Sequence, residues 1–75
     1  MRVQKLFVSG ERDSASLISA AEHEFAAEPA VRLDYVEVVD PETLQPKTSV
    51  TTPALVAVAA FLRQTRLIDN ILLEP

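Results

Sequence analysis

The stretch VRLDYVEVV, residues 31–39, decides the fold of this 75-residue chain. Its first half alternates between apolar and polar side chains, which places Val31, Leu33 and Tyr35 on one expected face, and its second half is almost wholly apolar. Alternation with a period of two is typical of a β-strand with one buried face, and the apolar end predicts deeper burial there. A single strand has nothing to pair with, so the rest of the chain must supply further strands.

The last third of the chain is the source of these strands, although its composition is ambiguous. Residues 53–62 are rich in alanine and could form a helix with Thr52 as its cap. The same residues are compatible with a strand, and the dipeptide at 63–64 separates two apolar runs as a hairpin connection does. Because three strands would close a sheet, we expect strands over about residues 54–62 and 65–73.

The first 30 residues predict two helices. Apolar residues at helical spacing, followed by the single glycine Gly10, indicate a helix over about residues 2–9. Either Asp13 or Ser14 can cap a second helix over about residues 13–27. The expected apolar face of this second helix consists of Leu17, Ile18, Ala21 and Phe25.

The predicted fold is therefore a single α+β domain over residues 1–75, with a small three-stranded antiparallel sheet packed against one or two helices. Asp40 precedes a proline and is expected to form a turn by bonding backbone amides two residues on. Leu44 is expected to tuck back onto the core, in a connection that runs to about Pro53. The core of so short a chain is small, and without cysteine no disulfide supplements it.

Composition excludes several classes of function. The net charge of -4 and the scattered basic residues oppose nucleic acid binding, which depends on cations that neutralise phosphates. No apolar run approaches the roughly 20 residues that cross a bilayer, so we expect no membrane partner and a cytoplasmic location. A phosphate-binding loop uses several glycines, and the chain has one.

Few residues are candidates for catalysis. His23 is expected on the solvated side of the second helix, where no residue at helical spacing could share a metal ion with it. Glu37 interrupts an apolar strand, and a structural ion pair with Arg32, Arg63 or Arg66 is a better interpretation than a catalytic acid.

The segment at 66–70, RLIDN, combines charged, amide and apolar side chains within a predicted strand. Arg66 and Asn70 would share one face, and Asp69 would lie on the other. Polar groups on both faces indicate that neither face is wholly buried in this chain. We therefore expect Arg66 and Asn70 to be exposed, or to contact another domain or another copy.

Several segments together resemble one enzyme family. Residues 33–44 (LDYVEVVDPETL), 57–60 (AVAA) and 65–71 (TRLIDNI) resemble the carboxy-terminal domain of pantothenate synthetase, and Gly-Glu-Arg at 10–12 also resembles the stretch before that domain's first strand. The resemblance covers nearly the whole chain. One departure is Arg63, where the family usually has a turn glycine, so the turn type is expected to differ.

The resemblance implies a pantoate-beta-alanine ligase, which uses ATP with magnesium to form a pantoyl adenylate that beta-alanine then attacks. In that family the adenylate forms in an amino-terminal domain carrying paired histidines and a loop resembling KMSKS, and the carboxy-terminal domain closes as a lid. None of these motifs has a matching position in this chain. We therefore predict no catalytic, cofactor-binding or metal-binding residue here.

Three hypotheses follow for the function of the chain. The first is a lid whose partner is the amino-terminal catalytic domain, as a fragment or a separate gene product, with no ligase activity and negligible ATP affinity alone. The second is a free-standing interaction or dimerisation module derived from that domain. A small independent enzyme that uses His23 and Glu37 is a much weaker hypothesis, because no further groups converge with these two.

Overall fold

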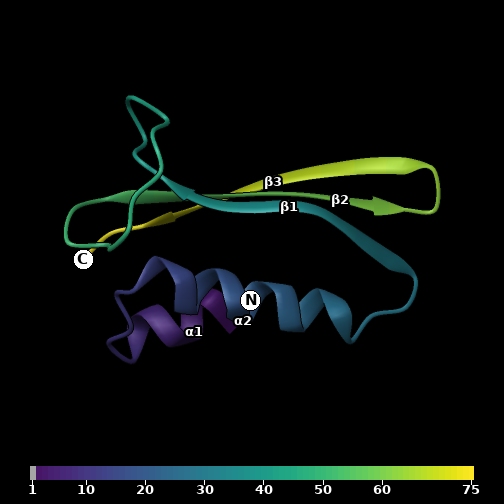
Figure 1. Ribbon diagram of the computed structural model, residues 1–75, viewed down its shortest axis with the longest axis horizontal. Coiled ribbons are helices and arrows are strands. Elements are labelled where there is room, and N and C mark those ends of the chain that lie inside the picture. The colour runs from purple at the N-terminus through teal and green to yellow at the C-terminus, as the bar shows by residue number, and fades with distance from the viewer. Residues whose placement is uncertain (1) are drawn as a thin grey trace.

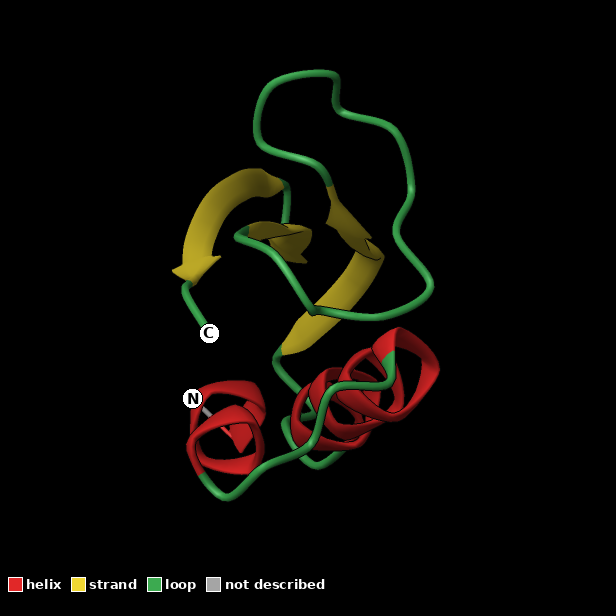
Figure 2. Ribbon diagram, turned by 90° about the vertical axis from the view of Figure 1, so that its left-hand side faces the viewer, coloured by secondary structure: helices red, strands yellow, loops and turns green. Residues whose placement is uncertain are grey.

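The computed structural model describes residues 2–75 and confirms the predicted α+β architecture. Two helices lie side by side beneath a three-stranded sheet (Figures 1 and 2). The elements are, in chain order, α1 (Arg2–Val8), α2 (Ser14–Ala26), β1 (Val31–Val39), β2 (Ala54–Leu62) and β3 (Thr65–Leu73).

The sheet is antiparallel, and β2 lies between β1 and β3 (Figure 1). The alanine-rich stretch thus forms the central strand and not a helix. Its alternate residues Ala54, Val56 and Val58 are buried in the core. Alanine favours helix locally, but hydrogen bonding along both edges of β2 and burial of its valines outweigh that preference.

The helices cover one face of the sheet. α2 lies against β1, and α1 packs against α2 (Figure 2). Buried apolar side chains from both layers and from the connection after β1 form one core, which consists of Val3, Phe7, Leu17, Ala21, Val38, Val50, Ala54, Val56, Val58 and Leu73. Within residues 2–75, neither helix is long and apolar enough to cross a membrane.

Local hydrogen bonds fix one end of each helix. After α1, the Glu11 N–H donates to the Leu6 carbonyl at 3.0 Å, across Gly10 with its φ of 114°. This is the pattern of a glycine C-cap, as the sequence predicts. At the start of α2, Asp13 is the N-cap, and its side chain accepts a hydrogen bond from the Ser16 N–H at 3.1 Å.

A β-bulge in β1 corrects the predicted faces of this strand. Leu33 pairs with Ala60 and Tyr35 pairs with Ala59, so Asp34 is an extra residue with no opposite partner. The extra residue reverses the alternation. Leu33 therefore packs against the core while Tyr35 lies on the opposite face, and the prediction that they share a face is wrong.

The connection between β1 and β2 projects away from the helices before it returns to the sheet (Figure 1). Asp40 Oδ1 accepts hydrogen bonds from the N–H groups of Glu42 at 2.8 Å and Thr43 at 3.0 Å, so the predicted turn forms. Leu44 has a φ of 61° and is 63% exposed, so the prediction that it packs on the core is wrong. Val50, further along the same connection, is fully buried in the core.

β3 is the outer strand on one side of the sheet, and most of it is uncovered. All six residues at 65–70 are exposed, Ile71 is half-buried and Leu73 is buried. Arg66 and Asn70 are therefore exposed, as the mixed character of this segment predicts. The helices support only the carboxy-terminal end of the strand.

Candidate functional site

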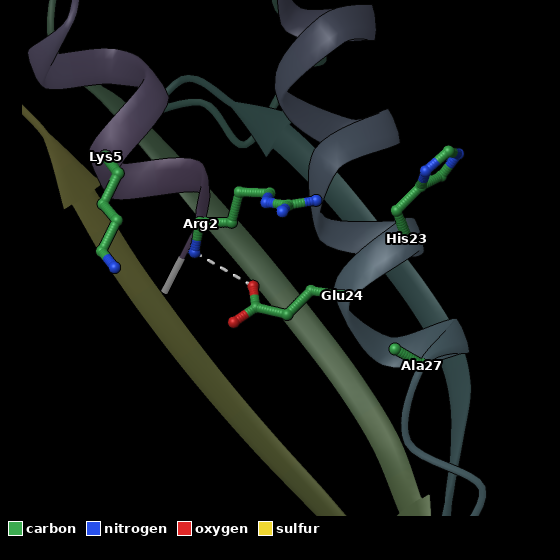
Figure 3. Close-up of a pocket in the computed structure, with 5 residues that line it drawn as sticks. All are labelled: Arg2, Lys5, His23, Glu24 and Ala27. Carbon is green, nitrogen blue, oxygen red and sulfur yellow. Dashed lines mark hydrogen bonds between the residues drawn. The ribbon is translucent and has the colours of Figure 1, made fainter.

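His23 borders a groove between α1 and α2 (Figure 3). The groove has a volume of about 440 Å³ and is lined by Arg2, Lys5, His23, Glu24 and Ala27. Glu24 points toward α1, where its Oε2 accepts a hydrogen bond from the Arg2 backbone N–H at 3.0 Å, whereas the exposed His23 ring points away (Figure 3). None of these described lining residues carries a hydroxyl or a thiol, so His23 has no nucleophile there to activate.

A second hollow, of about 680 Å³, lies between the helices and β3. It is lined by Gln4, Glu24, Asp69, Asn70, Ile71 and Leu72. Asp69 Oδ1 accepts a hydrogen bond from the backbone N–H of Asn70 at 2.8 Å. Glu24 and Asp69 make this hollow acidic, and its described lining includes no lysine or arginine, so it is unsuited to an anionic ligand.

Asp40 lies at the end of the sheet beside a third hollow, of about 440 Å³. The hollow is lined by Asp40, Pro41, Glu42, Thr52, Pro53 and Leu72. The hydrogen bonds from the Thr43 and Glu42 backbone N–H groups lower the pKa of Asp40 below its ordinary value. An aspartate stabilised as a carboxylate is a poor proton donor at neutral pH, so its turn role accounts for these contacts.

The sheet face away from the helices carries an ion pair between β1 and β3. Arg66 Nη2 lies 3.0 Å from Asp34 Oδ2, and the Arg66 guanidinium lies 5.9 Å from the centre of the Tyr35 ring. The two charged side chains are 45% and 40% exposed. Solvent screens a pair this exposed, so its net contribution to folding is small.

The predicted ion pair of Glu37 is wrong. In the described part of the chain, Arg66 pairs with Asp34, and the Arg32 guanidinium lies 4.8 Å from the centre of the Phe61 ring. Along β2, the residues opposite Arg66 and Glu37 are four positions apart, a span of roughly 13 Å. The bulge places Asp34 nearer to Arg66, and no spacing in the sequence marks that bulge.

These residues do not fit a magnesium–triphosphate complex. Among residues 2–75, no three histidine, aspartate or glutamate side chains gather in a way that could hold a metal ion. Triphosphate sites need convergent cations or a glycine-rich cradle of amides. The groove that has Arg2 and Lys5 in its wall is lined also by Glu24, and Gly10 lies outside it. We therefore assign no catalytic step to these residues.

A family model described as pantoate-beta-alanine ligase matches residues 1–72. The chain belongs to the pantoate-beta-alanine ligase family. The matching region is the carboxy-terminal domain of these enzymes. Membership in this ligase family thus confirms the resemblance that the strand segments carry in the sequence.

Two curated members of the family show how much of the enzyme the chain covers. Pantothenate synthetase from Acidobacterium capsulatum is 55% identical over 65 residues, which are 87% of this chain and 22% of that enzyme. Pantothenate synthetase from Koribacter versatilis is 50% identical over 74 residues, 99% of this chain and 25% of that enzyme. The chain therefore spans about a quarter of the length of these ligases.

A solved structure shows the same relationship in three dimensions. The crystal structure of pantothenate synthetase from Thermus thermophilus matches the chain with a TM-score of 0.85 and 33% sequence identity. The match covers 97% of this chain and 26% of that enzyme. The α+β fold is thus that of one part of a longer ligase.

Proposed function

We propose that this chain acts as the lid of a pantoate-beta-alanine ligase. In this proposal a separate amino-terminal domain binds ATP with magnesium and forms the pantoyl adenylate, and the chain closes over that site while beta-alanine attacks. The reaction would take place in the cytoplasm. The observation that carries the proposal is the match of nearly the whole fold to a quarter of the Thermus thermophilus enzyme.

The distribution of polar groups supports a lid role for this chain and a catalytic role for a separate domain. Adenylate formation needs preorganised cations or amides around a developing charge, and the donor set of the described residues does not fit that task. A lid needs surface that gains contacts on closing, because only differential contacts shift an open–closed equilibrium. β3 offers such surface in Arg66, Ile68 and Leu72.

Reconstitution tests the proposal. The partner would be the Koribacter versatilis synthetase with its matching carboxy-terminal quarter deleted, mixed with this chain, and the readout would be pantothenate formed from pantoate, beta-alanine and ATP. We expect the mixture to exceed the sum of the separate pieces. The chain alone should form no pantothenate and should show no micromolar affinity for magnesium–ATP in calorimetry.

A variant and its matched control sharpen the reconstitution. Arg66→Ala removes a half-exposed cation from β3, and Arg2→Ala removes one from the groove between the helices. If β3 meets the catalytic domain, the first variant lowers the activity of the mixture more than the second. A mixture no more active than its parts, or a chain that makes pantothenate alone, would contradict the proposal.

A further inference from the structure

The free edge of β3 has hydrogen-bonding groups that the sheet does not use. Leu62 and Thr65 flank a two-residue turn and face each other, so they form a hydrogen-bonded pair. Pairs in an antiparallel ladder alternate, so the N–H and C=O groups of Arg66, Ile68, Asn70 and Leu72 point away from β2. The N–H of Asn70 agrees, since it donates to the Asp69 side chain.

The side chains along this edge are unusually apolar for an uncovered strand. Leu67 is 51% exposed, Ile68 is 61% exposed and Leu72 is 51% exposed. Ile68 and Leu72 lie on the face away from the helices, and Leu67 lies on the helix-covered face, beyond the part that the helices shield. An edge with free backbone groups and exposed apolar side chains is a template for an added strand.

One register lets two copies of this edge complement each other. With Asn70 opposite Asn70 of the second copy, Ile68 faces Leu72 and Leu67 faces Leu73 of that copy. In the same register Arg66 faces Glu74, an opposite charge, and this contact occurs twice because the pairing is symmetric. Every exposed large apolar residue of β3 thereby gains an apolar neighbour, and the outward-pointing backbone groups pair with each other.

We propose that the β3 edge binds the β3 edge of a second copy of this chain, antiparallel and with Asn70 at the two-fold axis, to form a continuous six-stranded sheet. The proposal goes beyond the lid function and does not depend on it, although both use Arg66, Ile68 and Leu72, so a second copy and a catalytic domain would compete for β3. A chain that fails to reconstitute a ligase would still dimerise through β3, and a chain that reconstitutes one could still fail to dimerise.

Asp69 limits the strength of this association. Its carboxylate occupies the Asn70 N–H, which the second copy needs at the centre of the pairing. Asp69 would also face Ile71 of the second copy, with the two Asp69 side chains on one face as diagonal neighbours about 7–8 Å apart. Charged side chains beside an exposed edge are a common device against strand addition. The dimer is therefore reversible, with a Kd in roughly the micromolar range or weaker, because one strand edge buries little area.

Single cysteines test the register directly, since the chain has no cysteine of its own. Opposite Cα atoms in a hydrogen-bonded pair lie about 5.5 Å apart, within the range that a disulfide spans. Asn70→Cys should therefore cross-link with itself under mild oxidation. Ile68→Cys and Leu72→Cys should not cross-link alone but should cross-link when mixed. Glu22→Cys, at an exposed position on α2 that lines none of the three hollows described above, measures the background from random collisions.

Sedimentation velocity tests the energetics without a cross-link. Over protein concentrations from about 10 μM to 1 mM we expect a concentration-dependent dimer that Asp69→Ala strengthens. Glu74→Lys turns two attractive contacts into repulsive ones and should weaken the dimer by about tenfold. Glu22→Lys makes the same charge change on α2 and should not weaken the dimer.

Three results would overturn the proposal. The first is a wild-type chain that stays monomeric at about 1 mM together with an Asp69→Ala chain that does the same. The second is an Asn70→Cys cross-link no more abundant than that of Glu22→Cys. The third is stronger self-cross-linking by Ile68→Cys than by Asn70→Cys, which would place the two-fold axis at another residue. Circular dichroism of each variant confirms that it is folded before its association is compared.

Discussion

Replacing Arg63 with glycine should stabilise the domain, because the turn between β2 and β3 forces this residue into an unfavourable conformation. Arg63 has a φ of 57°, and Gln64 is not among the residues with positive φ. Positive φ at the first central residue alone matches a type II′ turn, which normally has glycine there. The family resemblance also implies a glycine at this position, so this chain has a less suitable residue there.

The size of the effect follows from two opposing terms. An L-residue in the left-handed region costs about 1–2 kcal/mol, which glycine avoids. Glycine loses about 0.5–1 kcal/mol more than other residues through its greater freedom in the unfolded chain. The side chain of Arg63 is exposed and forms no ion pair with the other described residues. We therefore expect Arg63→Gly to raise the free energy of unfolding by roughly 0.5–1 kcal/mol, and Tm by about 3–6 °C.

Urea and thermal unfolding followed by circular dichroism measure this change, and two further variants isolate its cause. Arg63→Ala removes the same side chain but keeps the Cβ, so it should not reproduce the gain. Gln64→Gly places glycine where φ is not positive, so it should lower the free energy of unfolding by about 0.5–1 kcal/mol. Equal gains from Arg63→Gly and Arg63→Ala, or destabilisation by Arg63→Gly, would refute the conformational argument.

Three other predictions concern the core, a helix cap and a turn. Leu17 is fully buried between α2 and the sheet, so Leu17→Ala should lower the free energy of unfolding, measured in urea, by about 2–5 kcal/mol. The control Val8→Ala, at an 85% exposed position, should lower it little. Asp13→Ala removes the N-cap of α2 and should lower the free energy of unfolding by about 1 kcal/mol. Because backbone hydrogen bonds lower the pKa of Asp40 in the folded state, its ionised form adds stability at neutral pH, and Asp40→Asn should be less stable than the wild type there.

Each of these predictions has an outcome that contradicts it. Ser14→Ala is the control for the cap, because the buried Ser14 Oγ has no hydrogen-bond partner among the described residues and its removal should cost much less. Equal losses at Asp13 and Ser14 would mean that capping is not the cause. The stability difference between wild type and Asp40→Asn should close as pH falls below about 4, through the lowered folded pKa of Asp40. A difference that persists at about pH 2 would show that the charge is not responsible.

Much of the fold is predictable from the sequence because its local signals agree with one another. Gly10 and Asp13 mark a helix end and a helix start, and both form the caps that their chemistry favours. The alanine-rich central strand is predictable only by a global argument, since β1 needs a pairing partner whatever the local helix propensity at 54–62. The need of β1 for a pairing partner, and not the local composition, makes residues 54–62 a strand.

The errors on the faces of β1 and on the ion pair of Glu37 have one physical origin, which is register. A bulge adds one residue to a strand at almost no cost in composition, and it reverses every face beyond it. The bulge at Asp34 therefore moved Tyr35 to the other face and gave Arg66 a carboxylate other than Glu37. Leu44 is a separate case, because the turn after Asp40 places it in the left-handed region with its side chain exposed.

The distribution of burial along the β2–β3 hairpin links its stability to its proposed roles. Its open end, where Ala54 pairs with Leu73, lies in the core, whereas Leu62 and Leu67 near the turn are 42% and 51% exposed. The strained residue Arg63 is at the same exposed end. Local opening should therefore begin at the turn and proceed toward Leu73, with amide hydrogen exchange fastest near residues 62–67. A catalytic domain or a second copy that contacts this part of the hairpin would stabilise it. Binding of either should therefore slow amide exchange near the turn before it slows exchange in the core.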